Sequence, residues 1–175
     1  MGKYVWLFPL LFIFHDMEEI IGFGIFLKKN KRMLDRKYPF VSRTYEPFST
    51  EGIAFGVFEQ FAVCLLFCIL ALLTDSRYVW LIWLGGLIAY TLHLLIHMVQ
   101  AAVIRTYIPA LATSILCLPV SLWCIVRSIE TLCASVGEII VFGVIGTVIV
   151  AVNLKFAQSL IRRFTRWMEG NMGKE

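Results

Sequence analysis

Long apolar stretches alternate along the chain with short connections that are rich in polar and basic residues. A helix needs roughly 20 apolar residues to cross a hydrocarbon core of about 30 Å. The five stretches that approach this length are residues 4–27, 53–73, 78–104, 107–126 and 138–153. The pattern predicts an all-α integral membrane protein, with about five transmembrane helices in one bundle over residues 1–154.

The tail that follows, residues 155–175, has the spacing of an amphipathic helix over 155–168. Its apolar face would consist of Phe156, Leu160, Phe164 and Trp167. Its other face would carry Arg162, Arg163 and Arg166. Such a helix is expected to lie flat in the membrane interface. The alternative is a plain cytoplasmic extension of the last span.

Composition agrees with a membrane protein. The chain has 175 residues, 59% of them hydrophobic, and a mean hydropathy of +0.80, whereas soluble domains are about 45 to 50% apolar. The net charge of +4 comes from basic residues gathered at the ends of the spans. Anionic lipid headgroups are therefore the expected partner, and nucleic acid is not.

The distribution of Lys and Arg predicts the orientation. Most of them lie in the first connection, residues 28–43, and in the tail, and Arg105 falls on the same side. The opposite side, which consists of the N-terminal residues and the alternate connections, holds only Lys3, Arg77 and Arg127. The positive-inside rule then puts the N-terminus outside and the C-terminus in the cytoplasm, in a membrane that we expect to be a bacterial inner membrane.

Ionisable residues interrupt three of the predicted spans. At the bilayer centre each charged side chain costs roughly 2.5 to 3.5 kcal/mol, so a chain usually keeps such residues for function. The interrupting residues are His15, Asp16, Glu18, Glu19, Glu59, His93 and His97. With the predicted orientation and a rise of about 1.5 Å per residue, the His and Glu side chains fall in one slab roughly 9 to 18 Å above the cytoplasmic edge.

Helical spacing also puts these groups on shared faces. Glu18 and Glu19 follow His15 by three and four residues, and His97 follows His93 by four. Tyr90 and Gln100 continue the second stripe. Each polar face also carries glycine, which lets membrane helices approach closely. Gly22 lies on the His15 face, Gly86 on the His93 face, and Gly52 and Gly56 on the Glu59 face. We therefore expect one buried site in the inner half of the bilayer.

The donor set predicts a metal site. Nitrogen and oxygen ligands without thiolate suit Zn, Fe or Mn, as one or two divalent ions. The expected ligands are His15, Glu18, Glu19, Glu59, His93 and His97. The expected supporting residues are Tyr90, Gln100, Asn153, which can also bond a neighbouring helix, and Asp16, as an acceptor for a ligand histidine or for water. The zinc-protease pattern fails, because Leu94 stands where a Glu should follow His93.

The first of these segments, His15-Asp16-Met17-Glu18-Glu19, reads H-x-x-E-E. With this motif, Glu59 and the later H-x-x-x-H of His93 and His97, the chain resembles the small membrane proteins named for their HXXEE domain. The resemblance extends from the first span through the fourth. It implies a helical membrane bundle with characteristic polar residues, and it implies no reaction, since the family is described as being of unknown function.

The leading functional hypothesis is a metal-dependent membrane enzyme, a hydrolase or group transferase. A lipid or another hydrophobic substrate would enter laterally, and either Glu18 or Glu19 would act as general base while the other binds metal. The alternatives are a metal-free Glu/His enzyme of the isoprenoid or sterol isomerase type, a di-iron oxidoreductase, and a proton or divalent-cation carrier. A carrier requires polar residues toward both faces, and the outer half has few.

Overall fold

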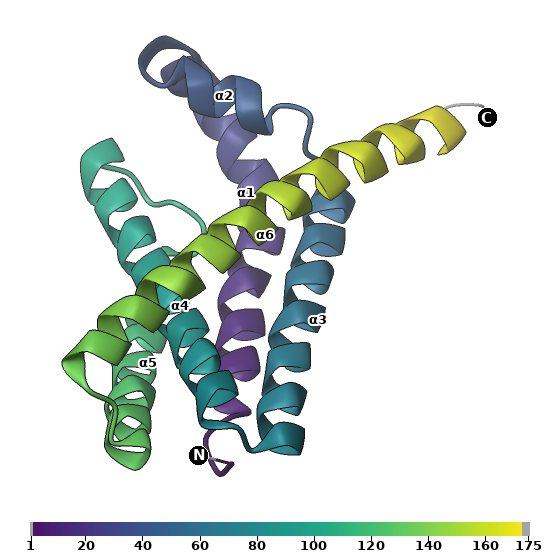
Figure 1. The fold of residues 1–175 in the computed structure, drawn as a ribbon. Coiled ribbons are helices and arrows are strands. Elements are labelled where there is room, and N and C mark those ends of the chain that lie inside the picture. The colour runs from purple at the N-terminus through teal and green to yellow at the C-terminus, as the bar shows by residue number, and fades with distance from the viewer. Residues whose placement is uncertain (1, 173–175) are drawn as a thin grey trace.

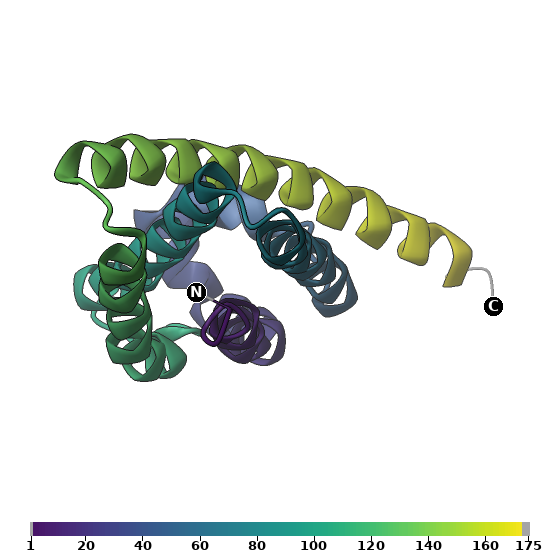
Figure 2. The same cartoon turned by 60° about the horizontal axis from the view of Figure 1, so that its bottom comes forward.

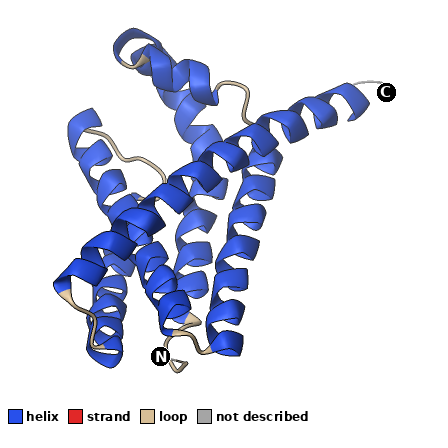
Figure 3. Ribbon diagram, viewed as in Figure 1, coloured by secondary structure: helices blue, strands red, loops and turns tan. Residues whose placement is uncertain are grey.

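The computed structural model describes residues 2–172, and the last three residues of the predicted tail, 173–175, lie outside this range. Within it the chain forms helices and no strand (Figure 3). The helices are α1 (Leu7–Lys37), α2 (Pro39–Tyr45), α3 (Thr50–Thr74), α4 (Arg77–Ile104), α5 (Leu111–Leu132) and α6 (Val136–Met172). The predicted all-α fold is confirmed.

Four of these helices, α3 to α6, are long and apolar enough to cross a membrane, which indicates an integral membrane protein. Residues 7–27 of the first predicted span lie in α1, which is not among the four. Its apolar run is interrupted by Asp16, Glu18 and Glu19, and its last ten residues are rich in Lys and Arg.

Four helix boundaries differ from the expected ones by four residues or more. One of them is the end of α5, at Leu132 instead of residue 126. Helix α1 continues to Lys37, beyond the predicted end at residue 27. Helix α5 begins at Leu111 instead of residue 107, because Ala110, which follows Pro109, has a left-handed backbone with φ of 76°. Helix α6 is continuous through residues 154 and 155, where a separate tail helix was expected to begin, because its middle contains no Gly or Pro to stop it.

In Figure 1, α1, α3, α4 and α5 run along the length of the molecule and α6 crosses them obliquely. Figure 2 shows α6 lying along one side of the bundle, with its C-terminal part projecting beyond α3. Helix α4 packs against α5 and α6, and α3 packs against α1 and α6. Helix α2, the connections on either side of it and the connection after α4 lie toward one end of the bundle, and the α3–α4 and α5–α6 connections lie at the other (Figure 1).

Helix α6 crosses α4 at a point where the two backbones touch. A Cβ atom on Gly85 would lie 2.1 Å from the Phe142 carbonyl oxygen, and one on Gly146 would lie 2.2 Å from the Gly85 carbonyl carbon. On α3, a Cβ on Gly56 would lie 2.6 Å from Cγ1 of Ile161. Small residues therefore permit both contacts of α6, as expected for membrane helices.

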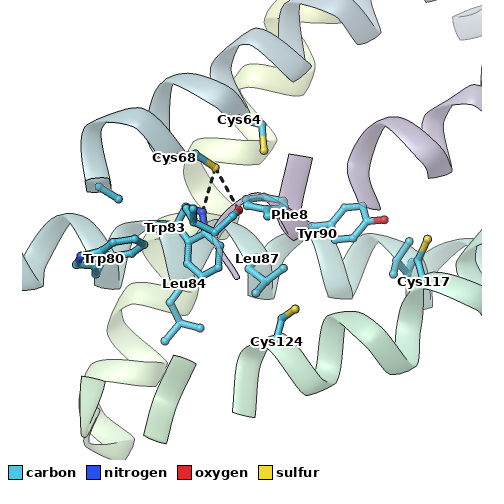
Figure 4. Close-up of a cluster of buried hydrophobic side chains, with 13 residues drawn as sticks. Phe8, Cys64, Cys68, Trp80, Trp83, Leu84, Leu87, Tyr90, Cys117 and Cys124 are labelled. Atoms are coloured by element: carbon cyan, nitrogen blue, oxygen red, sulfur yellow. Dashed lines mark hydrogen bonds between the residues drawn. The ribbon is translucent and has the colours of Figure 1, made fainter. Parts of the chain in front are cut away.

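A buried cluster between α1, α3, α4 and α5 sets the register of these helices (Figure 4). The Trp83 indole donates to Cys68 Sγ over 3.3 Å, and the Cys68 thiol donates to the Val5 carbonyl oxygen over 3.6 Å. Further along, the Tyr90 hydroxyl donates to the Leu11 carbonyl oxygen over 2.9 Å. These contacts hold the polar turn of α1 opposite the polar turn of α4.

Candidate metal centre

Two helices each present a pair of ligand side chains spaced one turn apart. Helix α1 contributes His15 and Glu19, and α4 contributes His93 and His97. One ligand atom from each residue can be chosen so that all four lie within 4.8 Å of one another. The expected convergence of α1 and α4 is therefore present.

The closest contacts in this group involve the Nε2 atoms of the α4 histidines. His97 Nε2 lies 2.9 Å from Glu19 Oε1 and 2.9 Å from His93 Nε2, and His93 Nε2 lies 4.0 Å from Glu19 Oε1. Ligands in a tetrahedral zinc site lie roughly 3.3 Å apart, given metal–ligand distances near 2 Å. Small side-chain movements would thus bring the four groups around one ion.

His15 is fully buried and completes the group from the α1 side. Its Nδ1 lies 3.1 Å from Thr113 Oγ1, and that hydroxyl donates its proton to Glu18 Oε2 over 2.7 Å. With its proton committed, the Thr113 hydroxyl can only accept from His15 Nδ1–H. The Nε2 lone pair of His15, which has no hydrogen-bond partner among the described residues, is then left for a metal.

Glu18 lies outside the group of four. Its carboxylate accepts hydrogen bonds from the Thr113 backbone N–H at 2.8 Å, from the Thr113 hydroxyl and from the Tyr107 hydroxyl. It faces α5 and the connection before it, so it supports His15 through Thr113. The sequence contained no signal for Thr113 or Tyr107, because neither belongs to an ionisable stripe.

Glu59 also lies outside the group. Its Oε1 accepts from Asn153 Nδ2 over 2.8 Å, which joins α3 to α6. Gly56, which was expected to share a face with Glu59, indeed lies against Ile161 of α6. This face of α3 packs on α6, so Glu59 does not reach the other ligands, and Asn153 bonds a neighbouring helix. With Glu18 and Glu59 directed elsewhere, the structure brings together four of the six expected ligands.

Of the expected supporting residues, some lie beside the metal ligands and others do not. The Tyr90 ring lies edge-on to His15 with ring centroids 5.9 Å apart. Asp16 is buried, and its Oδ2 has no partner among the described residues. The expected role of Asp16 as acceptor for a ligand histidine is therefore taken, for His15, by Thr113. Gln100 is exposed and lines the cavity described next.

A cavity of about 670 Å³ lies between α1, α2, α3, α4 and α6. Three of the four residues of the metal group, which consists of His15, Glu19, His93 and His97, form part of its wall. Glu19, His93 and His97 line it, as does Asp16. Most of the remaining wall is aromatic or aliphatic. Pockets for small ligands typically have about 300 to 1,000 Å³ and mostly apolar walls with a few polar groups, so this cavity has the properties of a binding site for a hydrophobic molecule.

The donor set of three imidazoles and one carboxylate fits Zn, Fe or Mn. One divalent ion, the Glu19 carboxylate and one bound hydroxide would sum to zero charge, which a low-dielectric interior favours. A second ion would need further carboxylates, but Glu18 and Glu59 are directed elsewhere. The geometry therefore fits one ion better than two.

The sequence of this chain matches a known protein family over the segment that contains the metal group. Residues 6–124 match the model of a family described as "Protein of unknown function with HXXEE motif". The match covers more than half of the chain, and all four residues of the metal group lie within it, so the chain belongs to this family, as the motif suggested. No curated protein and no solved structure matches the chain.

Proposed function

We propose that this protein is an integral-membrane metalloenzyme that carries out hydrolysis or group transfer on a lipid or another hydrophobic substrate. One divalent ion, Zn, Fe or Mn, would be bound by His15, Glu19, His93 and His97. The observation that carries the proposal is the approach of these four ligand atoms to within 4.8 Å of one another, with three of the four residues lining a largely apolar cavity.

The chemistry follows from the donor set. A bound ion of this class lowers the pKa of a coordinated water toward about 7 and polarises a carbonyl or phosphoryl oxygen. Glu19 supplies the anionic ligand, and the Glu18–Thr113 pair orients His15. Glu18 accepts three hydrogen bonds and faces away from the cavity, which favours a supporting role over that of a general base.

We further propose five membrane crossings, with α1 as the fifth crossing helix, the N-terminus outside and the C-terminus in the cytoplasm, in a bacterial inner membrane. Two observations support this topology. The long helices α1, α3, α4, α5 and α6 alternate in direction (Figure 1), and most basic residues lie at the end that holds α2 and the connection after α4. The buried location of His15 and Asp16 is consistent with α1 lying inside the bundle.

A metal-free acid–base enzyme is the second candidate. The specific observation in its favour is the 2.9 Å contact between Glu19 Oε1 and His97 Nε2, which would also serve proton transfer to and from an isoprenoid or sterol double bond. A di-iron centre would need the carboxylates that lie elsewhere, and a carrier would need a polar path that a largely apolar cavity does not offer.

Elemental analysis of protein purified without added metal tests the proposal. We expect about one equivalent of metal per chain, lost in His93→Ala and in Glu19→Ala. Glu59→Gln is the matched control, since Glu59 bonds Asn153 outside the group, and it should keep the metal. Folded, active protein that contains no metal would refute the metalloenzyme and leave the acid–base enzyme.

A further inference from the structure

A basic groove lies on the C-terminal half of α6. It has a volume of about 420 Å³, and its lining residues recur at helical spacing along one face. The lining residues are Lys155, Gln158, Ser159, Arg162, Arg163 and Arg166. Four of these six side chains are cationic and none is acidic.

Within residues 2–172, no ion pair compensates the positive charge of this basic groove. Lys31, Arg77 and Arg127 each form an ion pair with a Glu, whereas no basic residue of the groove does so among residues 2–172. Arg166 Nε donates to the Arg162 carbonyl oxygen over 3.2 Å, and the Arg162 guanidinium lies 5.8 Å from the centroid of the Phe48 ring. The arrangement leaves several cationic donors available to an anion.

The basic groove is continuous with the apolar cavity. Lys155 and Gln158 line both. On the cavity side, Phe48 and Ile161 line the wall near Lys155 and Gln158. The side chains that line the continuous space therefore change from cationic to apolar within a few residues of α6. This change matches an amphiphile, which has a charged headgroup joined to an apolar chain.

We infer that the basic groove and the cavity together bind one amphiphile with an anionic, phosphate-bearing headgroup. The headgroup lies against Arg162 and Arg166, and an apolar chain extends into the cavity toward the metal group. The inference rests on the proposed function, because it makes the cavity the substrate site, and it narrows the substrate class from hydrophobic molecules to anionic lipids.

The first test compares two lipids by native mass spectrometry in a neutral detergent. Phosphatidylglycerol and phosphatidylcholine with identical acyl chains are titrated onto the full chain. We expect one phosphatidylglycerol per chain, bound more tightly than phosphatidylcholine. A basic residue near an anionic headgroup contributes about fivefold in affinity. The double variant Arg162→Gln with Arg166→Gln should therefore bind phosphatidylglycerol about 25-fold more weakly. Lys28→Gln with Lys29→Gln, which removes equal charge from α1, should change little.

The second test asks whether the chain of the lipid occupies the cavity. Val150 and Val63 line it, so Val150→Trp and, separately, Val63→Trp should displace the lipid while thermal unfolding of each variant confirms its fold. Val141→Trp, at an exposed position on α6 outside the cavity, should bind phosphatidylglycerol as tightly as the natural protein does. Equal affinity for the two lipids would overturn the inference, as would unchanged binding in both folded cavity variants or displacement of the lipid by inorganic phosphate.

The same measurement on His15→Ala separates this inference from the metal proposal. This change removes a proposed metal ligand that does not line the cavity, and it leaves the basic groove intact. The preference for phosphatidylglycerol should therefore persist. A protein that contains no metal but prefers the anionic lipid would refute only the metalloenzyme, and a metal-containing protein with no lipid preference would refute only the inference.

Discussion

The candidate centre depends on a short chain of side chains behind His15. Thr113 accepts from His15 Nδ1 and donates to Glu18, so the hydroxyl links a metal ligand to a carboxylate without being a ligand itself. Groups that orient a ligand histidine in this way fix its tautomer, and their removal typically weakens metal affinity about 10- to 100-fold.

Thr113→Val should therefore weaken metal binding about 10- to 100-fold while His15, Glu19, His93 and His97 remain in place. Valine keeps the shape of threonine but cannot accept from Nδ1 or donate to Glu18. Competition with a chelator of known affinity measures the effect. The control is Thr131→Val, whose hydroxyl only bonds the Arg127 carbonyl in an exposed turn. Equal affinity in the two variants would show that Thr113 does not orient His15.

Metal removal should also lower stability. An ion that binds the folded chain and not the unfolded one stabilises the fold by about 2.7 kcal/mol at 100 times its Kd. We expect a chelator to lower the thermal unfolding temperature of the natural protein but not that of His97→Ala, which already lacks the site. The measurement is thermal unfolding in detergent, followed by intrinsic fluorescence. If the chelator lowered the unfolding temperature of both proteins equally, the loss of stability would not come from this centre.

At the scale of the helices, the position of α6 depends on its contact with α4. The backbones of Gly85 and Gly146 meet, so no side chain fits between them. The crossing carries α6 from the end near Arg77, which pairs with Glu138, to the end near Ser49, which bonds Thr165. A change at the crossing should therefore disturb the cavity wall that α6 provides.

Gly85→Ala should destabilise the fold, because its Cβ would lie 2.1 Å from a backbone oxygen of α6. Overpacking of this kind costs about 1 to 3 kcal/mol, and backbone contact puts this case at the upper end. Gly137→Ala is the matched control, since a Cβ there has no neighbour within 4 Å, and alanine favours a helix. Thermal unfolding compares the two variants, and a tolerated Gly85→Ala would mean that the helices do not cross so closely.

Hydrophobic length and charge were enough to predict the long helices, because each of these signals is local in the sequence. They could not predict that α6 would continue through residue 155. Both a span and an amphipathic tail are helical, and only a breaker such as Pro or Gly would have separated them. The start of α5 was missed because it depends on the left-handed backbone of Ala110, a residue type that seldom adopts it.

The candidate site was predictable only in part. The spacing of His15 with Glu19, and of His93 with His97, correctly put each pair on one face. Which face meets which partner depends on the rotation of each helix, and packing between helices determines that rotation. The Glu59 face lies against α6, and Glu18 turns toward Thr113, so neither reaches the group. Depth had suggested both residues, and helical spacing had also suggested Glu18.

For the whole molecule, the metal group, the cavity and the basic groove form a continuous series. The cavity joins the metal group on α1 and α4 to α6, where Lys155 and Gln158 connect it to the groove. In the proposed orientation the basic groove faces the cytoplasmic leaflet, whose anionic lipids attract basic segments. An experiment that determines the orientation of the protein therefore also tests whether the proposed anionic lipid comes from the cytoplasmic leaflet.

The exposed native cysteine provides that experiment. Cys133 lies in the connection between α5 and α6, whereas Cys64, Cys68, Cys117 and Cys124 are buried. In the proposed topology Cys133 faces the outside, so a membrane-impermeant maleimide should label it in cells whose outer barrier has been opened but whose inner membrane is intact. Cys133→Ser should abolish labelling, and adding Arg36→Cys to that variant should restore it only after the inner membrane is permeabilised. The reverse pattern would invert the topology and turn the basic groove away from the cytoplasmic leaflet.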